Sequence, residues 1–310
     1  GAGSSSFAGS LSLNFMRNIV DSSIKDNSSV NSGDEVNVIA SSDSFLLAVS
    51  GAGTGAGATA VGAVVSINET ETTTNATIAG QQTDVQARNN IVVNADDTTS
   101  MVVISAVGSG SGGVSGSGAV SKTVVSNTIT STIDGATVTS LEGSVDVLAG
   151  FKPTGDDIDF AGLGITLIDL PEDTDLGSQI LNIAIAGSGS GGGSIAGVIN
   201  LNWLRNSVEA GIKDGADVTA QSAVNVHAKD NASILAIGVG GDGAGGGSGA
   251  ASVSYNYIGG DPGDPSRDIP EDPSSSNAGR VLSYISNSSV NVTDGGVNVF
   301  SDANANIINI

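Results

Sequence analysis

The stretch from residue 212 to residue 249 reads IKDGADVTAQSAVNVHAKDNASILAIGVGGDGAGGGSG and contains one complete copy of the pattern that decides the fold. Ile212 and Val218 are followed by the alternation Val224-x-Val226-x-Ala228, and then by an apolar run and a glycine-rich tract. Alternation of apolar and polar residues over a few positions, bounded by Gly, Asn, Asp or Ser, is typical of short half-buried strands. Helical periodicity is nearly absent, so the stretch predicts strands and turns.

The same pattern occurs five times along the chain. The isoleucines that begin it and the valines that follow are Ile24 and Val30, Ile78 and Val85, Ile133 and Val138, Ile212 and Val218, and Ile285 and Val290. The next strand is predicted at Val36/Val38/Ala40, Ile91/Val93/Ala95, Val145/Val147/Ala149, Val224/Val226/Ala228 and Val297/Val299/Ser301. A fixed period indicates a stacked array, in which neighbouring units bury each other's apolar face.

The first two intervals between the isoleucines are 54 and 55 residues, and the next two, 79 and 73, contain insertions. The sequence therefore predicts an all-β fold, a repetitive parallel β-helix or β-solenoid with five repeats of about 54 residues. We expect residues 1–310 to form a single elongated array, with loops inserted at 150–178 and 259–279. A 54-residue unit is long enough for about two coils.

Antiparallel stacking is the structural alternative. The turns Asp134-Gly135 and Asp214-Gly215 separate one strand from the next, and glycine there supplies the positive φ that a sharp corner needs. The same two residues also suit a hairpin turn. The parallel form is favoured because turns of this kind recur at short intervals within a longer repeat.

The glycine-rich tracts recur in phase, at 51–60, 108–118, 187–193 and 238–249. A flexible linker is the usual interpretation of such a composition. Each tract here runs directly between apolar strands, and small side chains permit close approach of backbones. We therefore predict ordered, tightly packed glycine segments.

Composition narrows the possible functions. The 310 residues include 32 Asp and Glu but only 10 Lys and Arg, a net charge of −22, so the chain repels phosphate backbones and anionic membranes. We expect no nucleic-acid partner and no membrane insertion, since no apolar run approaches the length of a membrane helix. The chain has no cysteine, which excludes disulfides and thiolate metal sites. Its first residues do not form a signal peptide, so we expect a soluble chain, either mature or a fragment.

The two ends of the chain match adjacent parts of the repeat. Residues 306–310 match the apolar strand 234–237, and residues 1–6 match the glycine tract that follows that strand. Two explanations remain open: a window from a longer array, or identical subunits that join head to tail into a filament.

Calcium is the metal that the sequence suits best. Two acidic clusters in the first insertion offer hard oxygen donors, and the candidate ligands are Asp156, Asp157, Asp159, Glu172, Asp173 and Asp175. The alternative is that these carboxylates are simply solvated. No other cofactor is expected.

The sequence predicts no enzyme. His227 is the only histidine, and alternation places it on the strand face opposite Val224 and Val226. We expect it to be a solvent-facing strand residue without a catalytic role. No G-x-S-x-G motif accompanies it. Arg17 and Arg205, and likewise Lys25 and Lys213, occupy equivalent repeat positions, so they belong to the repeat rather than to a unique catalytic site.

The pattern I-x-D-G-A-x-V-x-A, then V-x-V-x-A, then I-L-A-I-G-V and a glycine tract, clearest at 212–249, resembles the repeats of giant bacterial surface adhesins of the filamentous-haemagglutinin and leukotoxin-like type. The resemblance covers nearly the whole chain outside the insertions. It implies a right-handed β-helix, an extracellular or cell-surface location, and a structural or adhesive role in a fibre. The expected partners are other copies or adjoining repeats, head to tail, and cell-surface glycans. The alternative is a carbohydrate-binding or carbohydrate-active β-helix, such as a phage-fibre-like receptor binder or a polysaccharide-degrading enzyme.

Overall fold

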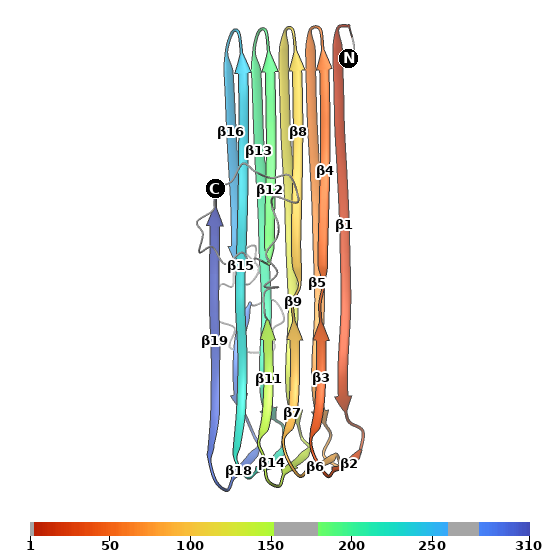
Figure 1. Cartoon of the computed structure of the whole chain (residues 1–310), viewed down its shortest axis with the longest axis vertical. Helices are drawn as coiled ribbons and strands as arrows, with labels where there is room; N and C mark the ends of the chain where they lie inside the picture. Colours follow the sequence, from red (N-terminus) through yellow and green to blue (C-terminus); the bar gives the residue numbers. More distant parts are fainter. Residues whose placement is uncertain (1–2, 152–178, 260–278) are drawn as a thin grey trace.

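The computed structural model describes residues 3–151, 179–259 and 279–310, which form β-strands, turns and no helix. The strands make three parallel sheets (Figure 1). Sheet 1 contains β1 (Ser5–Ile24), β5 (Thr59–Ala79), β9 (Val114–Asp134), β13 (Ser194–Lys213), β16 (Ser248–Ile258) and β17 (Arg280–Ile285). Sheet 2 contains β2 (Ser29–Ser32), β6 (Asp84–Ala87), β10 (Thr137–Ser140), β14 (Asp217–Ala220) and β18 (Ser289–Val292). Sheet 3 contains β3 (Val36–Ser42), β4 (Phe45–Ala56), β7 (Ile91–Asp97), β8 (Ser100–Ser111), β11 (Val145–Phe151), β12 (Ile180–Ser190), β15 (Ala223–Ala244) and β19 (Gly296–Asn309).

Each repeat forms one coil of a flattened solenoid. The chain descends a long strand of sheet 1, crosses a short strand of sheet 2 and ascends through sheet 3, and a tight turn then leads to the next coil (Figure 1). The prediction of a parallel β-solenoid with five repeats is confirmed. The expectation of about two coils per repeat is wrong. Strands such as β1, with 20 residues, and β5, with 21, are so long that one circuit of the solenoid takes a whole repeat.

The predicted apolar columns align from coil to coil. Val38 pairs with Val93, Val93 with Val147, Val147 with Val226, and Val226 with Val299. The isoleucine column runs in the same way from Ile24 through Ile78, Ile133 and Ile212 to Ile285. All ladders between the described strands are parallel, so the antiparallel alternative is excluded for these residues.

The corner between sheet 1 and sheet 2 uses left-handed backbone conformations. Gly80, Gly135 and Gly215 have φ values of 111°, 66° and 89°, and Asp214 has 59°. Glycine adopts this region without the penalty that a Cβ imposes. The predicted role of the Asp-Gly turns is confirmed.

The glycine tracts form the opposite edge of the solenoid, where sheet 3 turns back into sheet 1 (Figure 1). A Cβ placed on Gly192 would lie 2.6 Å from the backbone oxygen of Gly113, and one on Gly246 would lie 2.7 Å from that of Gly192. These distances are shorter than real Cβ contacts, so the turns of successive coils stack only without side chains. Close packing is confirmed at the turns of the glycine segments, whereas strand positions such as Gly53, Gly108 and Gly241 have room for a Cβ.

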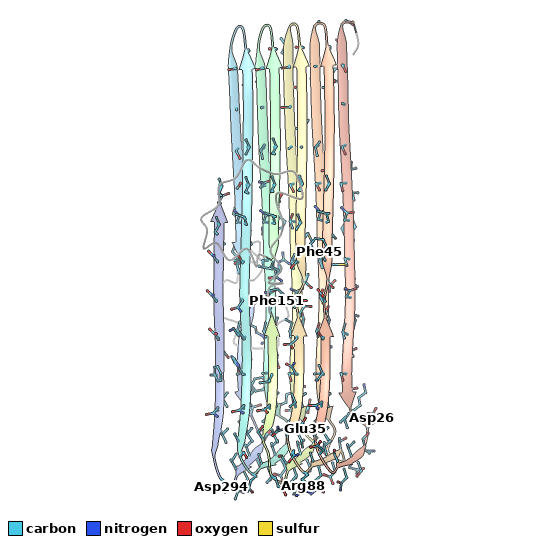
Figure 2. All side chains as sticks on the ribbon, viewed as in Figure 1. Asp26, Glu35, Phe45, Arg88, Phe151 and Asp294 are labelled. Atoms are coloured by element: carbon cyan, nitrogen blue, oxygen red, sulfur yellow. The ribbon has the colours of Figure 1, made fainter. Side chains whose placement is uncertain are left out.

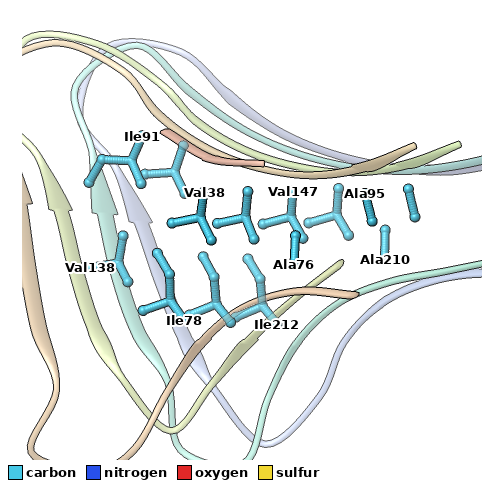
Figure 3. Close-up of a cluster of buried hydrophobic side chains, with 14 of the residues drawn as sticks. Val38, Ala76, Ile78, Ile91, Ala95, Val138, Val147, Ala210 and Ile212 are labelled. Atoms are coloured by element: carbon cyan, nitrogen blue, oxygen red, sulfur yellow. The ribbon is translucent and has the colours of Figure 1, made fainter. Parts of the chain in front are cut away.

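The interior is layered along the long strands. Nearest sheet 2 lies the largest apolar cluster, with columns that include Ile78, Ile212 and Val147 (Figure 3). A second cluster around Met101 and Leu204 and a third of mostly Val and Ala follow toward the glycine edge. Buried polar layers separate them; Asn14 bonds to Asn68 across coils at 2.7 Å in one such layer. The cluster nearest the glycine edge, which contains only Val and Ala, has the smallest side chains.

Both insertions leave the solenoid at one level of the long strands. Gly150 pairs with Lys229, and Ile180 pairs with Ile234. The first insertion therefore lies between two residues whose partners in the next coil are separated only by residues 230–233. The second lies between Ile258 and Arg280, where the preceding coil has residues 205–206. The side chain of Asn206 bonds to Asp230, so the two levels coincide. Residues 152–178 and 260–278 lie outside the described part of the chain.

Candidate interaction surface

The outward side of sheet 1 has an extended apolar area near the glycine edge. Outward residues that are register partners on neighbouring strands form rows, and each row crosses the coils. Four rows make up this area, which we call the apolar face: Phe7–Val61–Gly116–Ile195–Gly249, Gly9–Ala63–Gly118–Gly197–Ala251, Leu11–Val65–Val120–Ile199–Val253, and Leu13–Ile67–Lys122–Leu201–Tyr255. Phe7 is 76% exposed, Ile195 70% and Val253 58%. A contiguous exposed apolar area of this kind marks an interaction site.

The second row of the apolar face contains only Gly and Ala, between two rows with larger side chains. A Cβ on Gly118 or Gly197 would meet nothing within 4 Å. The fold itself therefore does not require glycine at these positions, unlike the turn glycines at Gly192 and Gly246. This row of small residues crosses all five coils parallel to the solenoid axis.

Three of the chain's aromatic residues gather at one corner of this face. Trp203 lies on β13, and its register partner Tyr257 lies on β16 two positions after Tyr255. The Nζ atom of Lys122 lies 4.8 Å from the centroid of the Trp203 ring, a cation–π contact. The indole nitrogen of Trp203 is buried without a hydrogen-bond partner. We call Lys122, Trp203, Tyr255 and Tyr257 the aromatic corner.

Charge is separated from the apolar face. Among its outward positions only Lys122 is charged, and carboxylates begin one row further from the glycine edge, with Glu69 and then Glu71. From the Glu71 row toward sheet 2, ion pairs connect neighbouring coils: Arg17 with Glu71 at 2.8 Å, and Arg280 with Glu209 at 2.6 Å. The surface of sheet 1 is therefore apolar toward the glycine edge and charged toward sheet 2.

Two carboxylates lie inside the solenoid. Burial raises the pKa of Asp230 to about 6, although a hydrogen bond from Asn206 lowers it. Burial also raises the pKa of Asp97, which accepts a hydrogen bond from the backbone nitrogen of Thr99 at 2.8 Å. Asp97 is 0% exposed and Asp230 8%, so neither presents a carboxylate to a dissolved substrate.

The structure places His227 as the sequence predicted, on the face opposite Val224 and Val226, which are fully buried. Its ring stacks on Phe300 of the next coil, with centroids 3.8 Å apart. Desolvation lowers the pKa of His227, and the carboxylate of Asp302 opposes this shift. Arg17 and Arg205 share one row through Glu71 and Ser126, as expected for features of the repeat.

The six proposed calcium ligands, Asp156, Asp157, Asp159, Glu172, Asp173 and Asp175, lie outside the described residues, so this site stays a prediction. Within the described ranges, no three His, Cys, Asp or Glu side chains gather as a metal site would require. The same ranges include no helix that could serve as a membrane span.

The solenoid is open at its C-terminal end. Val297 and Val299, which continue fully buried columns, are 45% and 42% exposed. The last strands β18 and β19 each pair on one side only, as do β1, β2, β3 and β4 at the other end.

Sequence reasoning missed the apolar face and the aromatic corner. The signal was present in the alternation: every second residue of 7–15, 61–67 and 195–203 is outward and mostly apolar or glycine. Recognising it required knowing which parity faces the interior. Comparison of the chain with protein-family models, curated proteins and solved structures gives no match in any of the three.

Proposed function

We propose that this chain is a structural and adhesive segment of a secreted or cell-surface filament, related in kind to the giant bacterial repeat adhesins, with further coils stacked head to tail on its ends. The observation behind the proposal is the column that contains Val226 and Val299. Val226 is fully buried, whereas Val299, one coil later, is 42% exposed. A further coil would bury the side chains that the terminal coil leaves open.

The physical role of such a segment is mechanical. Hydrogen-bonded ladders run along the solenoid axis in all three sheets, so axial extension would have to break many backbone bonds together. The net charge of −22 keeps the exterior soluble and opposes nonspecific collapse of neighbouring filaments.

The proposal is tested by imaging the purified chain across a concentration series. We expect fibres that lengthen as the concentration rises. Val297→Asp combined with Val299→Asp places charges on the open apolar columns, and fibres should then disappear while the β signal in circular dichroism remains.

Asn298→Asp is the matched control, because Asn298 lies between the two valines and points outward, where its amide bonds to Asn225 at 2.8 Å. This variant should still form fibres. A wild-type chain that stays monomeric at every concentration would contradict head-to-tail stacking.

Glycan binding at the aromatic corner is a second candidate function. Flat aromatic rings stack on sugar faces, and Trp203 lies beside Tyr257 on the neighbouring strand and beneath the cation of Lys122. Tyr255 is 44% exposed and extends the corner along β16.

A glycan array followed by calorimetry tests this candidate. Trp203→Ala should reduce binding of any captured glycan at least tenfold. Phe45→Ala, which removes an exposed ring from sheet 3, should leave it unchanged. Equal binding by both variants would exclude the aromatic corner.

A further inference from the structure

We propose that the apolar face of sheet 1 is an interface between two copies of this chain, packed face to face about a twofold axis. This lateral contact is separate from the head-to-tail stacking proposed above, since the apolar face lies on the side of the solenoid and not at its ends.

The area of the apolar face suits a stable dimer. It spans five strands and four outward rows, roughly 24 Å by 27 Å, or about 650 Å² per copy, from ordinary strand and residue spacings. Stable interfaces bury about 600–1,000 Å² on each partner. The exposed side chains are large: Leu11 is 67% exposed and Leu13 52%, in addition to Phe7 and Ile195.

The shape of the face is complementary to itself. The Gly and Ala row forms a groove, and the neighbouring row Leu11–Val65–Val120–Ile199–Val253 forms a ridge beside it. When two copies meet about a twofold axis, the ridge of each can enter the groove of the other. This is the isologous arrangement of symmetric dimers, and two sheet faces packed in this way lie about 10 Å apart. It also explains why Gly118 and Gly197 lack side chains although the fold leaves room for them.

The distribution of charge favours a second copy over an anionic membrane. Only Lys122 is charged within the face, and its cation is placed against Trp203. A net charge of −22 repels anionic lipid. A twofold arrangement in which the apolar halves overlap and the acidic halves point in opposite directions keeps the carboxylates of the two copies apart.

The outward apolar residues of sheet 3 are covered in the middle coils, where Leu181, Ile183 and Leu235 are 0%, 1% and 2% exposed. In the first coil, Leu47 and Val49 of the same rows are 48% and 66% exposed. Two rows nearer the glycine edge consist of glycine alone, Gly53–Gly108–Gly187–Gly241 and Gly55–Gly110–Gly189–Gly243. These glycine rows of sheet 3 therefore supply matched control positions.

The experiment measures the mass of the chain by light scattering and analytical ultracentrifugation in the Val297→Asp, Val299→Asp background, where axial stacking is blocked. We expect a monomer–dimer equilibrium. Gly118→Phe fills the groove and should raise the dimer dissociation constant at least tenfold. Gly241→Phe places the same ring on sheet 3, at a position with equal free space, and should leave the constant unchanged.

Cross-linking adds a readout that is independent of the Phe variants. The chain has no cysteine, so Gly118→Cys supplies the only thiol. A bismaleimide long enough to span two packed sheets should link two Gly118→Cys chains into a covalent dimer, whereas it should leave Gly241→Cys chains unlinked.

Three outcomes would overturn the proposal: a monomer at all concentrations, equal effects of Gly118→Phe and Gly241→Phe, or capture of the monomer by neutral lipid vesicles in place of dimerisation. Because axial stacking is blocked in this background, loss of fibres and loss of the dimer are distinguished.

Discussion

The amide nitrogen of Asn206, on β13, donates a hydrogen bond of 2.7 Å to the carboxylate of Asp230, on β15, and so connects the two long sheets across the interior of one coil. The same Asn206 exchanges hydrogen bonds with Gln179. The hydrogen bond from Asn206 offsets only part of the free-energy cost of burying the charged Asp230 carboxylate. The pKa of Asp230 is therefore raised.

Asp230→Asn should stabilise the protein at neutral pH. The pKa of Asp230 is raised from 3.8 to about 6 in the folded chain, so the folded state binds a proton between pH 6 and pH 4 that the unfolded state does not. Wild-type stability contributed by this group therefore rises as pH falls through 6 and levels off near pH 4. At pH 7 the variant should be more stable by up to about 3 kcal/mol, a difference that vanishes below pH 4.

Urea denaturation from pH 4 to pH 8 measures this effect. His227 has a lowered pKa and the opposite slope, but it is present in both proteins and cancels in the difference. Asp217→Asn removes an exposed carboxylate of β14 and should give a curve parallel to wild type. A parallel curve for Asp230→Asn would contradict the assignment.

Gly192→Ala should destabilise the solenoid, because its Cβ would lie 2.6 Å from the backbone oxygen of Gly113 in the preceding coil. Relief requires backbone movement, and overpacking of this kind costs about 1–3 kcal/mol. Thermal and chemical denaturation measure the loss. Gly241→Ala, where the Cβ meets nothing within 4 Å, is the control and should change stability by less than about 0.5 kcal/mol. Equal effects would show that stacking of the turns is looser than described.

Asn202→Ala should reduce stability by about 1–3 kcal/mol, because it removes two hydrogen bonds, one to the buried Asn182 and one to the half-buried Asn256. Asn202 accepts a hydrogen bond from Asn182 at 2.6 Å and donates one to Asn256 at 2.7 Å. Asn31→Ala tests whether burial is the cause, since Asn31 bonds to Gln86 across coils at 3.3 Å on the exposed surface. The exposed variant should lose less than about 0.5 kcal/mol, and a similar loss in both would argue against the buried ladder.

Phe151→Ala should cost about 3–5 kcal/mol, the range for removal of a buried aromatic ring. Phe151 is fully buried beside Asp97 at the end of β11, whereas Phe45 on β4 is 60% exposed (Figure 2). Phe45→Ala should therefore cost less than about 1 kcal/mol. Equilibrium unfolding of both variants makes the comparison, and an inexpensive Phe151→Ala would show that the chain near this residue packs differently.

Much of the architecture follows from local pattern. The columns through Ile78 and Val93 were predictable, because alternation assigns side chains to a face and the fixed period brings like residues together. Turn chemistry predicts a turn at Asp214 and Gly215 but equally suits a hairpin, and the structure shows a corner between two parallel sheets. The number of coils per repeat was not predictable in this way, since a strand of seven residues and one of twenty show the same alternation.

The sequence by itself determined that the chain is acidic, free of cysteine and built by stacking one apolar unit, because composition and period are properties of the chain before it folds. Only the tertiary structure decided that one repeat makes one coil and which glycines the packing requires. Gly192 and Gly118 are alike in sequence, but one touches the backbone of another coil and the other faces open space. The apolar face and the aromatic corner depend on register between strands more than fifty residues apart, and that register arises from contacts between coils.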